Sequence, residues 1–177
     1  MSAIAIIFLC VGVVAIIFVI MYFYYNNREI ALRKEAVAQR GKIAAIRDQM
    51  FKIIQEQGNV AADYRESFGK IFPEIISGRY KDGGSLMKFI QEANPHFETT
   101  LYRQLANSIE VQRGLFTSAQ TRMLDIINQR AALLEYMPSR WFIKDKSPIE
   151  YNVIQSSDTR SVVENATDDY TFSFGNK

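Results

Sequence analysis

Residues that could perform acid–base, nucleophilic or metal chemistry are few in this chain of 177 residues. His96 is the only histidine and Cys10 the only cysteine, whereas a zinc site of the usual type needs several such ligands. Serine and threonine hydroxyls therefore have a single histidine that could activate them. Glu110 and Asp125 lie about four turns apart on one predicted helix, too far apart to act as a pair. We therefore expect no catalytic residues, no metal ligands and no cofactor.

A glycine-rich segment at residues 78–84 is the other candidate for chemistry, because glycine-rich loops can hold phosphate groups. Gly83 and Gly84 precede Ser85, but the spacing and the lysine of a P-loop are absent. The segment instead predicts a turn, followed by a short helix from a cap at Ser85 to about Ala93. A membrane-tethered hydrolase would need ligands and nucleophiles that the sequence does not supply.

The longest feature of the sequence is an apolar run from Ala3 to Tyr25 in which Gly12 is the one residue that is not hydrophobic. Roughly 20 such residues in a helix match the hydrocarbon thickness of a bilayer. A cleaved signal peptide would have a basic start, a shorter apolar stretch and small residues before its cleavage site, and the run lacks all three. We therefore expect an uncleaved, single-pass transmembrane anchor at residues 1–27.

The charges that follow this run predict its orientation. Basic residues outnumber acidic ones there, with Arg28, Arg33, Lys34, Arg40, Lys42 and Arg47 against Glu29 and Glu35. Positive charge close to a span stays on the cytoplasmic side. We therefore expect the amino terminus outside and the bulk of the chain in the cytoplasm. The excess of positive charge is either a topology signal alone or also a weak attraction to anionic lipid headgroups.

Two long amphipathic helices are predicted after the span, because apolar residues recur at intervals of three or four from about residue 28 to 71 and from about 96 to 137. The first helix is expected to continue through Gly58 and to break at Phe72, since Pro73 disfavours helical geometry in the residue before it. The second is expected to start with Asn94 as its cap and Pro95 as its first residue.

Polar residues occur at three informative positions of these helices. Gln112 and Arg130 interrupt the apolar stripe of the second helix, where they either fix the register or extend to solvent. We expect them to extend to solvent. Glu29 and Arg33 have the favourable order for an ion pair between residues i and i+4.

Each long helix has an apolar stripe that needs a partner, and each extends roughly 60 to 65 Å at about 1.5 Å per residue. The sequence therefore predicts an all-α fold in which the two helices form an antiparallel hairpin or bundle of the coiled-coil kind, joined by short helices. This helical domain is assigned to residues 28–145. Without the anchor, about 41% of the residues are hydrophobic, which suffices for a packed core.

Such a hairpin would return residues 138–144 to the bilayer surface. There Trp141 and Phe142, flanked by Arg140 and Lys144, either contact the membrane interface or cap the lower end of the helical core. The residues that we expect at the membrane interface are Tyr24, Tyr25, Arg28, Trp141 and Phe142. Residues 146–177 are rich in Ser, Thr, Asn and Asp and predict a flexible polar tail, or alternatively a segment that docks a partner.

These features together resemble the LemA family. The resemblance consists of the uncleaved span, the Tyr25-Asn26 pair at its exit, the helical hairpin, and the stretch from Leu101 to Arg113 before the aromatic Phe116. Pro138 also falls where members often have a proline closing this helix. The match covers roughly residues 1 to 140. Residues 42–54 lack the family's usual Gln-Leu-Lys-Arg-Arg-x-x-Leu-Ile-Pro-Asn-Leu segment, and residues 116–117 are not its second Tyr-Asn pair.

The resemblance implies a divergent member, of bacterial or bacteriophage origin, in the bacterial inner (plasma) membrane. It carries over no catalytic residues, because no general biochemical activity is established for the family. We expect a non-enzymatic, membrane-anchored helical scaffold or adaptor whose partners are the lipid bilayer, an unknown protein and further copies of the chain, and not nucleic acid. The alternative is an oligomerising membrane-remodelling or lysis-related factor, although the span offers only Gly12 and Ala15 for close packing.

Overall fold

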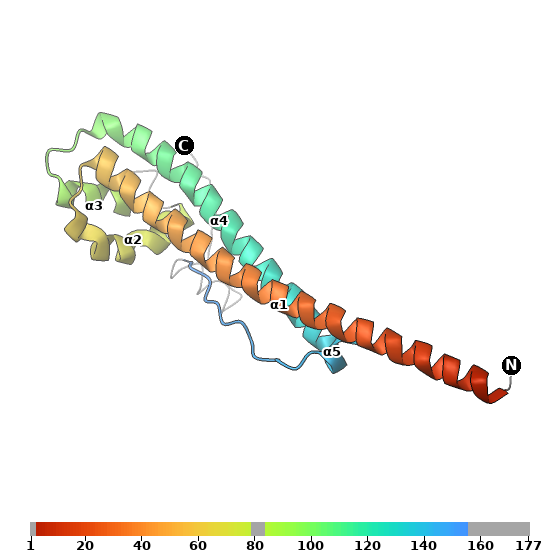
Figure 1. Ribbon diagram of the computed structural model, residues 1–177. Coiled ribbons are helices and arrows are strands. Elements are labelled where there is room, and N and C mark those ends of the chain that lie inside the picture. The colour runs from red at the N-terminus through yellow and green to blue at the C-terminus, as the bar shows by residue number, and fades with distance from the viewer. Residues whose placement is uncertain (1–2, 79–83, 156–177) are drawn as a thin grey trace, which may run out of the picture. The chain divides into compact units, whose positions relative to one another are not determined.

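All regular secondary structure in the described part of the chain, residues 3–78 and 84–155 of a computed structural model, is helical (Figure 1). The prediction of an all-helical fold is therefore confirmed for these residues. The elements are α1 (Ala3–Gly58), the 3-10 helix η1 (Ala62–Tyr64), α2 (Arg65–Ser77), α3 (Ser85–Ala93), α4 (Thr99–Glu135) and α5 (Ser139–Phe142). The short helix expected to run from a cap at Ser85 to about Ala93 is present as α3, but its cap residue is Gly84 and Ser85 is its first helical residue, so the predicted serine cap was wrong. Residues 79–83 of the predicted turn lie outside the described residues.

The chain divides into two compact units, and both long helices contribute to each. Unit 1 contains residues 1–44 and 118–151. Of the described residues, unit 2 contains 45–78, 84–117 and 152–155. Hence each unit holds one part of α1 and one part of α4.

Unit 2 is built around a cluster of aromatic rings. Centroids are 5.2 Å apart for Phe51 and Phe68, 5.5 Å for Phe68 and Phe72, and 5.1 Å for Phe72 and Phe116. Phe68, Phe72 and Phe116 are almost completely buried. Tilted and edge-to-face pairs of this kind add stability beyond the area that they bury. The cluster joins α2 to the parts of α1 and α4 in this unit.

The helix α1 ends at Gly58. The prediction that one helix continues through this position was therefore wrong. Asn59 has a φ of 49°, in the left-handed region that ends helices and that asparagine tolerates better than most residues. Gly58 also lies close to α3, since a Cβ on it would be 3.6 Å from Ile90 Cγ2. Tyr64 and Phe68 continue the apolar spacing from which one helix was predicted over residues 28–71, but they belong to η1 and α2.

Pro73 lies inside α2 and does not interrupt the helix at Phe72. The prediction of a helix break at this position was wrong. Phe72 is 1% exposed, and Phe68 and Ile75 on the same helix are also buried. Burying side chains of this size contributes about 1.5–3 kcal/mol each. Together they outweigh the loss of the one backbone hydrogen bond that a proline cannot donate.

The second long helix begins at Thr99, and not at Pro95 as predicted. Asn94 forms a turn instead of a helix cap: its Nδ2 donates to the Gly58 carbonyl at 3.1 Å, and its Oδ1 accepts from the His96 N–H at 3.2 Å. The Phe97 N–H donates to the Asn94 carbonyl at 3.1 Å, and the Phe97 side chain is buried. Contacts of Asn94 with a residue 36 positions away thus override the local preference for a helix start.

Unit 1 pairs its part of α1 with its part of α4. Gln39 Nε2 donates to the Ala119 carbonyl at 2.9 Å, and Glu29 bonds to Arg130 at 2.9 Å. Because residue numbers rise on one helix as they fall on the other, the two segments run in opposite directions within this unit. Apolar residues buried along them are Leu32, Ala36 and Ile43 on α1, and Ala119, Met123 and Ile126 on α4.

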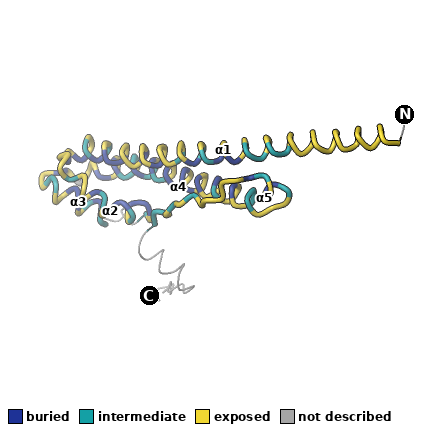
Figure 2. Tube along the Cα trace, turned by 60° about the horizontal axis from the view of Figure 1, so that its bottom comes forward, coloured by how far each residue is buried: buried dark blue, intermediate teal, exposed yellow. Residues whose placement is uncertain are grey.

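The first part of α1 is exposed over its whole circumference. Every residue from 3 to 20 is exposed, including Phe8 at 73% and Ile4 at 65% (Figure 2). The helix is long and apolar enough in this part to cross a membrane.

Candidate membrane-interface site

The short helix α5 is held against α1 where the apolar run ends. Asn26 Nδ2 donates to the Phe142 carbonyl and to the Tyr22 carbonyl, at 2.9 Å in both cases. The Phe142 ring stacks on Tyr25 with centroids 6.0 Å apart and an interplanar angle of 13°, and its centroid is also 6.0 Å from that of Phe18. These contacts bring residues that are 116 positions apart to the same level of unit 1.

The five residues predicted at the membrane interface lie around this contact in two groups. Tyr25 and Phe142 are half-buried and pack on each other. Tyr24, Arg28 and Trp141 are exposed, and Trp141 has 70% of its surface accessible. Of the two arrangements considered for residues 141 and 142, Phe142 packs against α1, whereas Trp141 leaves its ring open to the surroundings.

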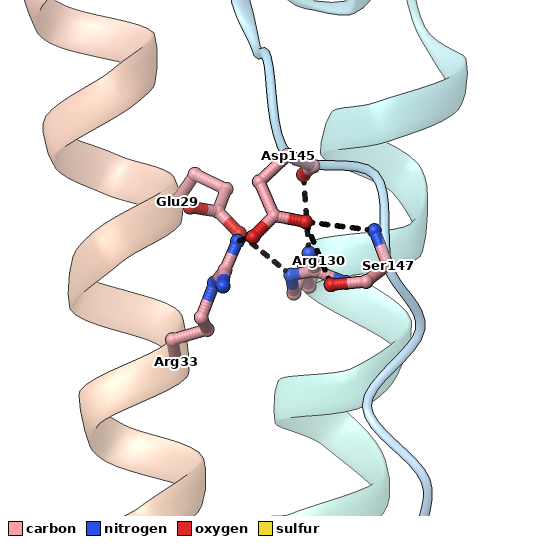
Figure 3. A network of polar contacts seen from close by, with 5 residues as sticks. All are labelled: Glu29, Arg33, Arg130, Asp145 and Ser147. Carbon is pink, nitrogen blue, oxygen red and sulfur yellow. Dashed lines mark hydrogen bonds and ion pairs between the residues drawn. The ribbon is translucent and has the colours of Figure 1, made fainter.

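A polar network lies beside this aromatic contact and joins three segments of unit 1 (Figure 3). Glu29 Oε1 accepts from Arg130 Nε at 2.9 Å and from Arg33 Nε at 2.8 Å, so the predicted ion pair of Glu29 and Arg33 is confirmed. Arg33 Nη2 also contacts Asp145 Oδ2 at 2.5 Å. Arg130 Nη2 donates to the Asp145 carbonyl at 3.2 Å.

The positions of Arg130 and Gln112 contradict the expectation that both side chains extend to solvent. Arg130 is 3% exposed and Gln112 is 8% exposed. Arg130 can be buried because its charge is balanced by Glu29, which is itself 4% exposed. Removal of one partner from such a buried pair leaves an uncompensated charge and is strongly destabilising. The pair therefore fixes how α1 and α4 meet within unit 1.

The exposed carboxylate of Asp145 is held by a short turn and by a cation. Its Oδ1 accepts from the Ser147 N–H at 2.9 Å and from the Ser147 hydroxyl at 2.6 Å. These bonds, together with the Arg33 guanidinium, lower the pKa of Asp145 well below its ordinary value. The Glu29 and Asp145 carboxylates in turn raise the pKa of Arg33.

The lowered pKa of Asp145 predicts how the packing of residues 143–151 against α1 and α4 depends on pH. A carboxyl whose folded pKa is depressed stabilises the folded state above its ordinary pKa of about 4, and that contribution is lost only as pH falls through the lower folded value. Hydrogen exchange of residues 143–151, corrected at each pH for the intrinsic exchange rate, should therefore be unchanged between pH 7 and about pH 4 and should accelerate below. In Asp145→Asn, exchange should already be faster at neutral pH. An equal acceleration above pH 5 in both proteins would contradict this prediction.

The segment that follows Asp145 also contacts the two helices of unit 1. The Arg40 guanidinium donates to the Glu150 carbonyl, and the Tyr151 hydroxyl donates to Gln120 Oε1 at 3.1 Å. Partial burial raises the pKa of Tyr151. The first residues of the predicted flexible tail thus contact α1 and α4. Residues 146–155 form no strand. The rest of the predicted tail, residues 156–177, lies outside the described residues.

Residues from the stretch between Leu101 and Arg113 have structural contacts in unit 2. Arg113 Nη2 pairs with Glu110 Oε1 at 2.6 Å, and Arg113 Nη1 donates to the Ile76 carbonyl at 3.3 Å, near the end of α2. Gly78 follows with a φ of 88°, the left-handed conformation in which glycine commonly ends a helix. The Arg113 side chain, which pairs with Glu110, therefore connects α4 to the end of α2.

A groove of about 390 Å³ opens beside the aromatic contact of unit 1. Its lining residues are Tyr25, Arg28, Leu32, Gln129, Ala132, Leu133, Tyr136, Met137 and Ser139. Arg28 Nη2 donates to Gln129 Oε1 at 3.1 Å across it. The predicted residues Tyr25 and Arg28 thus share one surface with α4 residues that the sequence did not single out.

No family model matches this sequence, no curated protein matches it, and no solved structure matches its fold. Within residues 3–78 and 84–155, no group of three or more His, Cys, Asp or Glu side chains could hold a metal ion. What the geometry of unit 1 offers is a long exposed apolar helix, an aromatic contact at its end, and surface cations beside a groove.

Proposed function

We propose that this protein is a non-enzymatic, single-pass membrane-anchored scaffold or adaptor with a LemA-like architecture, which acts through protein–protein contacts. The observation that carries the proposal is the exposed apolar surface of residues 3–20. Burying one Val, Ile or Phe side chain is favourable by about 1.5–3 kcal/mol. A surface with so many of these side chains is stable in a hydrocarbon layer and very unfavourable in water.

In the proposed topology, residues 3–25 cross the bacterial inner membrane with the amino terminus outside, and the rest of the chain is cytoplasmic. Support comes from the basic residues that follow the span, such as Arg28 and Lys34, which are exposed on α1. The proposed hairpin pairs α1 with α4 in opposite directions within each unit. Its supports are the Glu29–Arg130 pair in unit 1 and the bond from Gln57 Nε2 to Ser108 Oγ at 3.2 Å in unit 2.

An adaptor needs an exposed surface that can bind another protein, and α4 offers one in unit 2. Leu101, Val111 and Leu115 are 47%, 63% and 50% exposed. At about 100° per residue they lie within about 80° of one another around the helix. We assign these three residues as the proposed partner-binding stripe, because they are the large apolar side chains exposed on this face of α4 in unit 2.

Site-specific photo-cross-linking in native membranes tests this function. A photoreactive amino acid at Leu115, in the full chain, should form adducts with one defined set of other proteins. The matched control is the same amino acid at Arg103, which is exposed on the other side of α4 and should give few adducts. Adducts only between copies of this chain would favour the oligomerising membrane-remodelling factor. Equal adducts at both positions would contradict a specific partner-binding stripe.

A further inference from the structure

The groove of unit 1 combines apolar, aromatic and cationic groups at the end of the apolar run. Leu32 and Leu133 form apolar parts of its wall, and the Tyr25 and Tyr136 side chains also line it. Arg28 supplies a guanidinium group with five N–H donors, and its contact with Gln129 uses only part of this capacity. A guanidinium beside aromatic and aliphatic groups suits a ligand that has a phosphate at one end and hydrocarbon at the other.

The charges around the groove favour an anionic ligand. Arg33 and Arg130 are balanced by Glu29 and Asp145 in the polar network and leave little net charge there. The further exposed cations on this part of unit 1 are Arg28, Arg140, Lys144 and Lys146. Apart from Asp145, which pairs with Arg33, the exposed carboxylate closest to α5 in the chain is Glu135. The surface beside the groove is therefore positive.

The level of the groove along α1 indicates where this ligand would come from. Asn26 holds the Phe142 carbonyl, so α5 lies at the last residues of the apolar run. Lys144 Nζ is 6.0 Å from the ring centroid of Tyr22, which places a cation at the same level. Trp141 exposes most of its ring between Arg140 and Lys144. Exposed tryptophan and basic residues at the end of a span are typical of the headgroup region of a bilayer.

We propose that the groove and α5 bind the phosphate headgroup of an anionic phospholipid, with Arg28 contacting the phosphate, Arg140 of α5 adding positive charge, and the acyl chains continuing along the apolar part of α1. This inference rests on the proposed function, because only a membrane-spanning α1 brings the groove to the lipid surface. A soluble phosphate would use the cations but not the leucine and tyrosine side chains that line the groove. The bound lipid would fix the height and rotation of unit 1 at the membrane.

Fluorescence of Trp141 can test the proposal, because it is the only tryptophan in the chain. The full chain is reconstituted in vesicles of phosphatidylcholine with a minor fraction of phosphatidylglycerol. Brominated phosphatidylglycerol and, separately, brominated phosphatidylcholine are introduced at the same mole fraction. The attraction of one basic residue to an anionic surface corresponds to a factor of about five in affinity, so brominated phosphatidylglycerol should quench Trp141 several-fold more strongly. The double variant Arg28→Gln/Arg140→Gln should remove most of this difference.

The control variant Arg103→Gln removes an exposed cation of unit 2 and should keep the full preference for the anionic lipid. Equal quenching by both brominated lipids in an inserted protein would overturn the lipid site, as would a preference that survives the double variant. Insertion is measured separately by extraction of the vesicles with alkaline carbonate. A protein that is extracted would contradict the proposed function itself, so the two failures are distinguishable. Unchanged helical circular dichroism shows that each variant is folded.

Discussion

Replacement of both Val13 and Ile16 by arginine should release the protein from the membrane. The two side chains are 52% and 62% exposed, so the substitutions disturb no core of the described chain. An arginine at the centre of a span costs about 2.5–3.5 kcal/mol on insertion scales, and two would cost about 5–7 kcal/mol. The membrane fraction that resists alkaline carbonate extraction should fall by at least half, measured by quantitative immunoblotting.

The matched control for this change is Val13→Leu with Ile16→Leu, which keeps the surface apolar and should leave the protein in the membrane fraction. If the arginine variant resisted carbonate as well as this control, residues 3–25 would not be the anchor. If both variants were extracted, association with the membrane would depend on the exact shape of these side chains and not on their hydrophobicity.

The second large effect is expected at the buried ion pair of unit 1. Arg130→Ala leaves the Glu29 carboxylate buried with only Arg33 as a cation, and breaking such a pair typically costs about 3–5 kcal/mol. The opening free energy of α4 residues 118–135 should fall by about this amount. Hydrogen exchange with mass spectrometry on the full chain in lipid nanodiscs measures this value for unit 1 separately from unit 2.

A double replacement separates loss of the pair from loss of a charge partner. In Glu29→Leu/Arg130→Met both charges are replaced by apolar groups, which is often neutral or stabilising for buried pairs. Its local stability should therefore return close to that of the unaltered protein. A double variant as unstable as Arg130→Ala would show that the pair is needed for its polar contacts, such as the bond from Arg130 to the Asp145 carbonyl.

Features of the fold that depend on neighbouring residues were predictable from the sequence. The apolar run from Ala3 to Tyr25 gave the apolar start of α1, because length and composition suffice for that inference. The glycine-rich segment before Ser85 indicated where α3 begins, although the cap residue is Gly84 and not the serine. The ion pair of Glu29 and Arg33 was predictable for the same reason, since residues four apart on a helix are neighbours.

Features that depend on distant contacts could not be predicted in this way. Gly58 ends α1 because the chain meets Ile90 and Asn94, more than 30 residues later. Pro73 remains within α2 because Phe72 is buried in an aromatic cluster. At Pro73 the local preference favoured a helix break, and the cost of about 3 kcal/mol for a proline inside a helix is exceeded by the packing of several side chains. Gly58 and Asn59 did carry a local signal for a helix end, because glycine disfavours the helix interior and asparagine tolerates the left-handed region.

The candidate site was predicted only in part, for a related reason. Aromatic and basic residues near the end of the span indicated Tyr25, Arg28 and Phe142. The sequence did not indicate that Arg130 is buried or that Asp145 bonds to Arg33, because these pairs are separated by 101 and 112 positions. A basic residue within an apolar stripe was the one available signal, and extension to solvent is its more common explanation.

The accessibility of Cys10 to water tests the central claim most directly, because it is the only cysteine and lies within the apolar run. A membrane-impermeant maleimide should not label Cys10 of the full chain in vesicles, whether they are sealed or opened, and should label it after the membrane is dissolved in denaturing detergent. A cysteine at the exposed position Asn107, in a Cys10→Ser background, should be labelled whenever the cytoplasmic face is accessible. Rapid labelling of Cys10 in intact membranes would contradict a transmembrane α1.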